Sequence, residues 1–216
     1  MKKLGFTLSE VIIALGIIGV IAAITSPLIG GIIPDKDKIQ VLKYHKNLSN
    51  LIEETLNDPS LYLKFYEEGH TCVGLGCVDQ PVNPNYQSSI YRGSNKLSYI
   101  LASKLDLIVS PRPVSAWKIE FITTDGVSLL SEQTAGGETE EGEELVYEIT
   151  MDLNDTKAPN CFYSSSCKKP DRFKFYVDTY GKVTGNDPLT RAYLLNPHKL
   201  NDKKADYAKA KELLAN

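Results

Sequence analysis

The stretch that decides the fold is Lys2–Val20, KKLGFTLSEVIIALGIIGV, in which two lysines precede a long apolar run. The run continues without a charged residue from Val11 to Ile33. At 1.5 Å per helical residue it would reach roughly 35 Å, which is enough to cross the hydrocarbon core of a bilayer. The sequence therefore predicts a long N-terminal helix whose first half spans a membrane.

Charges on either side of this run predict its orientation. Lys2 and Lys3 precede it, whereas the acidic and basic residues at 35–38 cancel one another. Because positive charge is retained on the cytoplasmic side, the N-terminus is expected in the cytoplasm and everything after Ile33 outside it.

A cleaved secretory signal peptide is the alternative interpretation, because small residues such as Ala22 and Ala23 lie near a suitable cut. Two features oppose it. Glu10 interrupts what should be an uninterrupted apolar core, and the apolar run extends beyond the usual length of such a core. A retained anchor is the favoured prediction.

The residues from Lys2 to Glu10, KKLGFTLSE, resemble the class III signal of type IV pilins and type II secretion pseudopilins. The shared features are a short basic leader, a glycine, a phenylalanine, and a glutamate four places after the phenylalanine. Gly19 and Pro27 also fall where that family tends to have a helix-weakening glycine and proline. The resemblance covers Met1 to about Pro27.

This resemblance implies a filament subunit with three parts: a leader peptide at 1–5, a transmembrane and filament-core helix at 6–34, and an exported pilin-like domain at 35–216. A prepilin peptidase would cleave between Gly5 and Phe6, and Phe6 would be N-methylated. The implied partners are other pilin subunits, an inner-membrane assembly platform and, before assembly, membrane lipid. The protein would begin as a single-pass inner-membrane protein and end in a filament in the periplasm or at the cell surface.

In such a filament Glu10 would serve assembly, because its buried charge needs a partner that the Phe6 amine of a neighbouring subunit would supply. The alternative is a carboxylate that merely favours the start of a helix through the helix dipole. The alternative function is a membrane-anchored extracytoplasmic binding protein that does not polymerise. The sequence contains no recognisable catalytic motif, so we predict no enzyme.

Charge is unevenly distributed along the exported part. The whole chain has a formal net charge of −3, which gives no indication of nucleic-acid binding. Residues 119–155 hold eleven Asp or Glu and no Lys or Arg, whereas residues 156–216 hold twelve basic and six acidic residues. Such runs are commonly solvated faces, and the alternative is complementarity between neighbouring subunits, which would set their register.

Four cysteines form two close pairs, Cys72 with Cys77 and Cys161 with Cys167. In an exported protein an even number of cysteines suggests disulfides, although four allow three connectivities. The two local bridges are the favoured prediction, and a zinc site built from all four cysteines is the alternative, with wider spacing than usual.

The expected fold class is α+β, a pilin-like fold with the long N-terminal helix packed on an antiparallel sheet. Helical spacing of apolar residues continues from Asp35 to Asn57 and recurs at 95–107 and 201–216. Strand patterns at 117–124 and 127–131 flank an Asp-Gly turn, and further strands are expected at 146–153, 173–177 and 182–184, giving a sheet of about four strands. The acidic stretch 132–144 is predicted to be a solvated loop.

The segment 152–160, followed by Asp171-x-Phe173-x-Phe175, resembles a D-x-N-G-x-x-G-P-N loop before a D-x-F-x-F strand in many pilin-like proteins, with Asp155 and Ala158 in place of the glycines. Asp152, Asn154 and Asp155 supply oxygen atoms at the spacing of a calcium loop, and some relatives bind calcium near this end. A plain Asx turn is the alternative.

Overall fold

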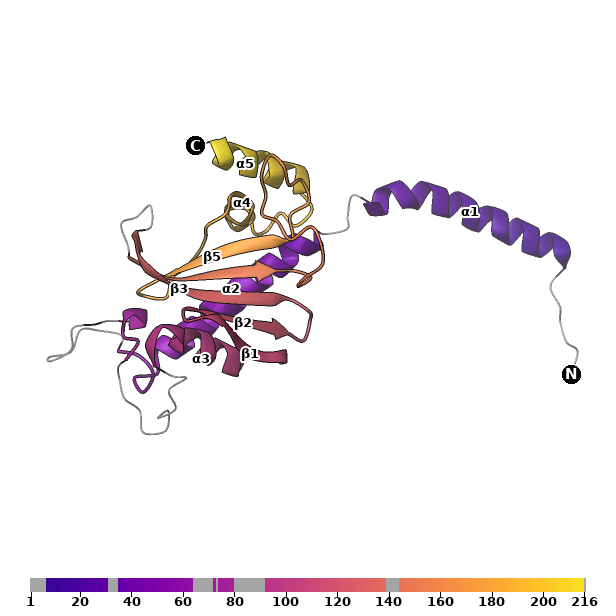
Figure 1. Cartoon of the computed structure of the whole chain (residues 1–216). Coiled ribbons are helices and arrows are strands. Elements are labelled where there is room, and N and C mark those ends of the chain that lie inside the picture. Colours follow the sequence, from indigo (N-terminus) through magenta and orange to yellow (C-terminus); the bar gives the residue numbers. More distant parts are fainter. Residues whose placement is uncertain are drawn as a thin grey trace, which may run out of the picture.

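The computed structural model describes residues 7–30, 35–63, 72, 74–79, 92–138 and 144–215. Helix α1 (Leu8–Gly30) and helix α2 (Lys36–Leu56) come first, and residues 31–34 between them lie outside the described part. The short 3-10 turns η1 (Gly74–Gly76) and η4 (Gly93–Asn95) precede helix α3 (Lys96–Lys104). Six strands and two C-terminal helices complete the order, as Figure 1 shows.

The strands are β1 (Leu107–Ser115), β2 (Lys118–Thr123), β3 (Ser128–Glu138), β4 (Glu144–Asp152), β5 (Arg172–Asp178) and β6 (Val183–Gly185). They form one sheet in sequence order, and every neighbouring pair is antiparallel. An antiparallel sheet and helices that are not interleaved with its strands confirm the predicted α+β class.

Helix α2 forms because its apolar residues repeat at helical spacing and both of its ends are capped. The buried stripe contains Val41, Leu48 and Ile52, which belong to the core cluster. Figure 1 shows helix α2 running across one face of the sheet. The Asp35 side chain accepts a hydrogen bond from the Asp37 amide at 3.1 Å and so caps the first turn. The sequence predicted this helix almost to the residue.

The inner face of the sheet follows the strict alternation expected of a half-buried sheet. In β2, β4 and β5 every second side chain is buried, and these side chains join the same core cluster as the stripe of α2. The buried members are Ile119, Phe121, Tyr147, Ile149, Met151, Phe173, Phe175 and Val177. The core therefore lies between α2 and one face of the sheet.

Two sequence expectations for the sheet were wrong. The sheet has six strands instead of about four, because β1 was not expected. The acidic stretch 132–144 is not simply a loop, since β3 continues to Glu138 and β4 begins at Glu144. Pairing of Gly137 with Leu145 and of Glu138 with Glu144 keeps these residues in the ladder despite their poor strand propensity.

The C-terminal helices α4 (Pro188–Leu195) and α5 (Lys203–Ala215) pack on one another and close one end of the domain. Asp187 caps α4 by accepting hydrogen bonds from the amides of Leu189 and Thr190, and Pro188 occupies the first turn, where its missing N–H costs nothing. Helix α5 was predicted, but its side chain Leu214 is 46% exposed instead of facing the core.

A buried ion pair fixes α5 to the start of α2. Lys38 Nζ lies 2.7 Å from Asp206 Oδ2, and the two side chains are 0% and 2% exposed. Lys38 also donates to the Lys199 carbonyl at 3.1 Å, and its ammonium group lies over the Tyr193 ring. Three partners satisfy the buried ammonium group, which explains how a lysine is tolerated beside the apolar stripe of α2.

Candidate functional site

Helix α1 begins with a reciprocal cap between Thr7 and Glu10. Glu10 Oε2 accepts hydrogen bonds from the Thr7 amide at 2.8 Å and from the Thr7 hydroxyl at 2.7 Å. The Thr7 hydroxyl oxygen in turn accepts a hydrogen bond from the Glu10 amide at 3.3 Å. This is a capping box, which satisfies two backbone donors that a helix start leaves without partners.

The capping box holds the Glu10 carboxylate against the backbone of Thr7, one residue after the predicted new N-terminus. Glu10 was expected to act in assembly, and its partner Thr7 was not predicted, although the T-x-x-E pattern is the signal of a capping box. The predicted cleavage residues Gly5 and Phe6 lie outside the described residues.

Behind this cap, α1 exposes its apolar side chains all around in the single chain. Leu8, Ile12 and Leu15 are 79%, 61% and 64% exposed. Among the described residues, none of the helices is long and apolar enough to cross a membrane. The exposed side chains nevertheless form an apolar surface of the kind that marks a protein or membrane contact.

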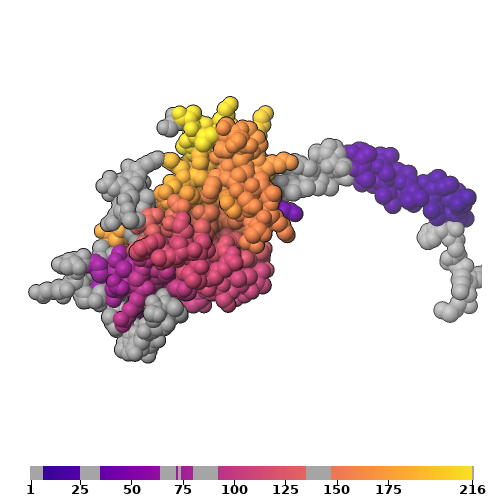
Figure 2. Space-filling view, viewed as in Figure 1, coloured from indigo at the N-terminus to yellow at the C-terminus, as the bar shows by residue number. Residues whose placement is uncertain are grey.

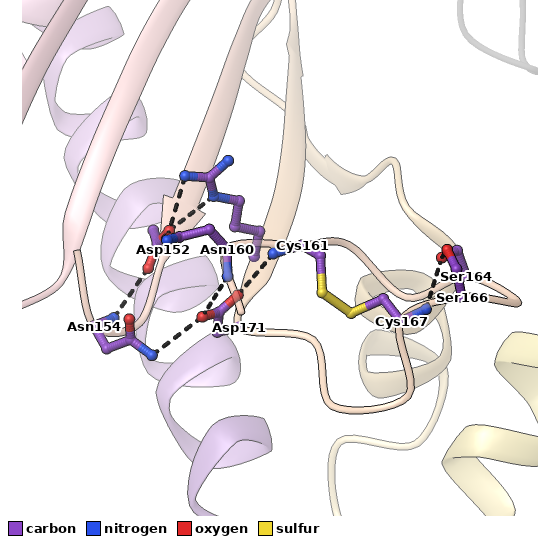
Figure 3. The surroundings of a disulfide bond; sticks show 9 residues. Asp152, Asn154, Asn160, Cys161, Ser164, Ser166, Cys167 and Asp171 are labelled. Carbon is purple, nitrogen blue, oxygen red and sulfur yellow. Dashed lines mark hydrogen bonds and ion pairs between the residues drawn. A yellow bond between two sulfur atoms is a disulfide. The ribbon is translucent and has the colours of Figure 1, made fainter. Parts of the chain in front are cut away.

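A second group of polar residues surrounds the disulfide between Cys161 and Cys167, where the chain passes from β4 to β5 (Figure 3). Asp171 organises it from the residue before β5. Asp171 Oδ2 accepts hydrogen bonds from Asn154 Nδ2 at 3.2 Å and the Asn160 amide at 3.0 Å, and Asp171 Oδ1 accepts one from the Cys161 amide at 2.9 Å. One buried carboxylate thus ties both ends of the connection together.

Of the three predicted calcium ligands, Asp152 ends β4, and Asn154 and Asp155 lie in the turn that follows it. Asp152 Oδ2 is ion-paired with Arg172 Nε at 2.8 Å, and Asp152 Oδ1 accepts from the Asn154 amide at 3.1 Å. Asp155 adopts a left-handed backbone, with φ of 61°. Burial raises the pKa of Asp152, while the hydrogen bond from Arg172 opposes that rise. A calcium ion on Asp152 would compete with Arg172.

Both predicted cysteine pairs lie at disulfide distance. The Cα atoms are 5.1 Å apart in the pair Cys72–Cys77 and 6.3 Å apart in the pair Cys161–Cys167. Each lies within the range that a disulfide requires. Across the described residues no group of three or more His, Cys, Asp or Glu side chains is arranged to hold a metal ion.

Residues 1–26 match the family model of the prokaryotic N-terminal methylation motif. No curated protein and no solved structure gives a significant match to the chain. The matched region contains the Gly5–Phe6 pair, the capping box and the first 19 residues of α1. The N-terminus of this chain therefore carries the signal of type IV prepilins and pseudopilins, the type of N-terminus that a prepilin peptidase processes.

Proposed function

We propose that this chain is a structural subunit of a type IV pilus-like or type II secretion pseudopilus filament. The observation that carries the proposal is the methylation motif at residues 1–26, which continues into an apolar helix with exposed side chains. The role is structural and not catalytic. After cleavage by the prepilin peptidase, α1 would form the core of the filament by packing on the α1 helices of neighbouring subunits.

Two properties of α1 support this role. Removal of residues 1–5 would leave a charged Phe6 amine one residue before Thr7, next to the helix cap that positions Glu10. The apolar side chains beyond Glu10 would lose contact with lipid and gain contact with one another in a bundle. An acidic group and an ammonium group that enter an apolar bundle together are far better tolerated than either alone.

We infer the location from the same features. The precursor would sit in the inner membrane with its N-terminus in the cytoplasm, and α2, the sheet and the C-terminal helices would lie outside. The assembly platform and the other subunits would then meet it there, and the filament would extend into the periplasm or to the cell surface. Two cysteine pairs at disulfide distance fit an oxidising compartment.

Three variants separate the charge of Glu10 from its capping role. Glu10→Gln keeps an oxygen that accepts from Thr7 but removes the charge, Glu10→Ala removes both, and Thr7→Val removes only the hydroxyl contact. We expect Glu10→Gln and Glu10→Ala to be processed normally but to yield far fewer sheared filaments, whereas Thr7→Val should assemble. Normal assembly of Glu10→Gln together with failure of Glu10→Ala would show that Glu10 acts only as a helix cap and that its charge is not needed.

Gly5→Leu is the matched control for processing. It should block cleavage and leave an intact precursor in the membrane, which migrates more slowly than the mature chain on a gel. Mass spectrometry of the native N-terminus distinguishes the proposal from its alternative, a non-polymerising membrane-anchored binding protein. A methylated Phe6 at the terminus supports the filament subunit, and an uncleaved Met1 terminus would contradict it.

A further inference from the structure

An open basic pocket lies where the first turn of α2 meets the connection after β4 and the first turn of α5. It has a volume of about 880 Å³, and apolar surface is contributed to its wall by Leu153, Pro159, Pro170 and Tyr207. Figure 2 shows part of this side of the domain, where the violet start of α2 emerges beside the orange segment that follows β4. We call it the lysine pocket, because five lysines line it: Lys36, Lys168, Lys169, Lys203 and Lys204.

The lysine pocket has an excess of positive charge. Its lining contains two carboxylates, Asp37 and Asp171. Asp171 already accepts three hydrogen bonds within the connection, and Asp37 lies 3.7 Å from Lys203. No ion pair between described residues includes any of the other four lysines. The pocket therefore favours an anionic occupant that supplies a counter-charge to these ammonium groups.

Two helices begin at the pocket, but their backbone amides are already capped. Lys36 is the first residue of α2 and Lys203 is the first residue of α5. The Asp35 side chain caps α2, and Asp202 Oδ1 accepts a hydrogen bond from the Ala205 amide at 3.2 Å in the first turn of α5. An anion in the pocket would therefore contact the lysine side chains and not the helix ends themselves.

The lysine pocket stays close to the apolar segment of the chain. Lys36 follows Ile33, the last residue of the uncharged apolar run, by three residues. Three residues reach at most about 10 Å in any conformation, and the headgroup layer on each side of a bilayer core is roughly 5–8 Å thick. If α1 lies in a membrane, as the proposed function requires of the precursor, the pocket lies at or beside the lipid headgroups.

We propose that the lysine pocket binds the headgroup of an anionic phospholipid while the chain is anchored in the membrane. The phosphate diester would accept hydrogen bonds from the ammonium groups of lysines such as Lys168 and Lys204, and Leu153 and Tyr207 would contact the apolar part of the lipid. A zwitterionic headgroup is disfavoured, because its own ammonium group would face the lysines. The inference rests on the proposed membrane location but not on polymerisation.

The fold supplies positive charge that the sequence next to the apolar run does not show. Residues 35–38 hold two Asp and two Lys, whose charges cancel, whereas Lys168, Lys169 and Lys204 reach the same place only in the folded domain. These distant lysines have little influence on membrane orientation, because large domains are exported regardless of their charge. The folded domain would then be drawn to an anionic membrane surface, and the attraction would weaken at high salt.

The first test measures lipid selectivity by native mass spectrometry of the full-length chain, released from micelles that hold equal amounts of phosphatidylglycerol and phosphatidylcholine. We expect the chain to retain phosphatidylglycerol in preference by about fivefold or more. Lys36→Gln with Lys204→Gln should bring the ratio toward one, and so should Lys168→Gln with Lys169→Gln. Equal retention of both lipids by the wild type, or an unchanged ratio in both variants, would overturn the proposal.

Lys46→Gln with Lys211→Gln is the matched control for the first of these variants. It removes two positive charges from the same two helices, at exposed residues outside the pocket. It should keep the selectivity of the wild type, and all variants should keep both disulfides and the wild-type melting temperature. If the control loses as much selectivity as the pocket variants, net charge and not the pocket attracts the lipid, and the proposal is wrong.

The second test locates the contact in a bilayer. The full-length chain is reconstituted into vesicles of phosphatidylcholine alone or of phosphatidylcholine mixed with phosphatidylglycerol, and a water-soluble reagent acetylates the outward-facing lysines. Mass spectrometry should show slower labelling of Lys168, Lys169 and Lys204 in the mixed vesicles, and equal labelling of Lys46 and Lys211 in both. Equal labelling of the pocket lysines in both vesicles, or equal protection of all five residues, would contradict the proposal.

Other sources of anionic groups give different results in the same vesicles. Protection by inorganic phosphate in phosphatidylcholine, without protection by phosphatidylglycerol, would assign the pocket to a free phosphate. Protection that rises with protein density in phosphatidylcholine, and not with phosphatidylglycerol, would assign it to a second copy of the chain. Either result would overturn the proposal.

Failure of the lipid site and failure of the filament function can be told apart. Glu10→Gln should lower the yield of sheared filament but keep the preference for phosphatidylglycerol, because Glu10 lies outside the pocket. A wild type that prefers phosphatidylglycerol but forms no filament would contradict the filament function alone. A wild type that forms filaments but shows no lipid preference would contradict the lipid site alone.

Discussion

Single carboxylates hold several helix starts and turns of this domain in place. Asp35 and Asp187 cap α2 and α4, Asp171 ties the connection between β4 and β5, and Asp125 holds the turn between β2 and β3. In each case a side-chain carboxylate oxygen accepts a hydrogen bond from a donor in the helix start or turn that it holds. Some of these carboxylates also bind distant elements, since Asp125 accepts hydrogen bonds from Lys43 and Tyr44 of α2.

Asp125 makes the stability of the domain depend on pH. Partial burial opposes its charge, but hydrogen bonds from Lys43, Tyr44 and Thr123 outweigh this and lower the pKa of Asp125 to about 2. Because the folded pKa is below the unfolded value of about 3.9, the stabilisation is complete above the unfolded value and is lost as pH falls toward the folded one.

We therefore expect Asp125→Asn to lower the melting temperature of the exported region at pH 7, and the difference from wild type to shrink as pH falls from about 4 toward 2. Thermal unfolding followed by circular dichroism at a series of pH values measures this. Glu53→Gln, which removes an exposed charge from α2, is the control for loss of charge alone. A constant difference at every pH would contradict the assignment.

The buried pair of Lys38 and Asp206 predicts a strongly non-additive result. Asp206→Asn leaves the Lys38 ammonium group buried without its counter-charge and should cost about 3–5 kcal/mol of unfolding free energy. Lys38→Met combined with Asp206→Leu should recover most of that loss, because no charge then remains buried. Urea unfolding of the wild type, of Lys38→Met and Asp206→Leu alone and of their combination measures the coupling, and additive costs would show that the two residues do not act as a pair.

Calcium is predicted to have little effect on this fold. Arg172 already forms an ion pair with Asp152 at 2.8 Å, so a calcium ion bound there would have to displace the guanidinium group. We expect the melting temperature of the exported region to be the same in millimolar calcium and in chelator. A rise in calcium would show that the ion displaces Arg172, because a ligand that binds only the folded state must stabilise that state.

At the scale of elements, two glycine turns with similar backbones differ in what surrounds them. Gly181 has φ of +85°, and an added Cβ would lie 2.5 Å from Leu56 Cδ1 and 2.8 Å from Ile52 Cγ2. Gly126 has φ of +82°, with no atom within 4 Å of an added Cβ. The turn after β5 therefore presses against the end of α2, while the turn after β2 is open.

Alanine at each position separates backbone strain from steric contact. Gly126→Ala should cost about 1–2 kcal/mol, since only the left-handed backbone is penalised. Gly181→Ala should cost clearly more, because the end of α2 must also move away from the turn. Denaturant unfolding of both variants provides the comparison, and equal costs would show that α2 yields freely at this point.

Sequence predicted the elements whose signals are local and missed those that depend on neighbours. The stripe of α2 and the Asp125-Gly126 turn are readable directly. Strand β1 was missed because it contains Pro111 and Pro113 and is mostly exposed, so it shows no alternation. Helix α4 was also missed, because it is short. The Asp187-Pro188 cap was the signal that could have predicted its start.

At the scale of the whole molecule, one part of the candidate site could be predicted from sequence, and the other part depends on contacts that only the fold shows. The motif around Glu10 was readable from sequence because all of its residues lie within one short stretch. The partners of Lys38 and Asp152 are 168 and 20 residues away in the chain, so only the fold reveals them. The pocket lined by Lys36, Pro170 and Lys203 likewise gathers residues from α2, α5 and the connection after β4.

The prolines of β1 have a consequence wherever molecules of this chain meet at high local concentration. Strand β1 is an edge of the sheet, its register with β2 is irregular, and Pro111 and Pro113 offer no N–H group to another strand. Sheets of adjacent molecules are therefore discouraged from fusing through this edge into an amyloid-like stack, which would be practically irreversible. Crowded molecules that are held together by side chains alone would stay separable. A fibre built from them could therefore be disassembled, and its subunits could be used again.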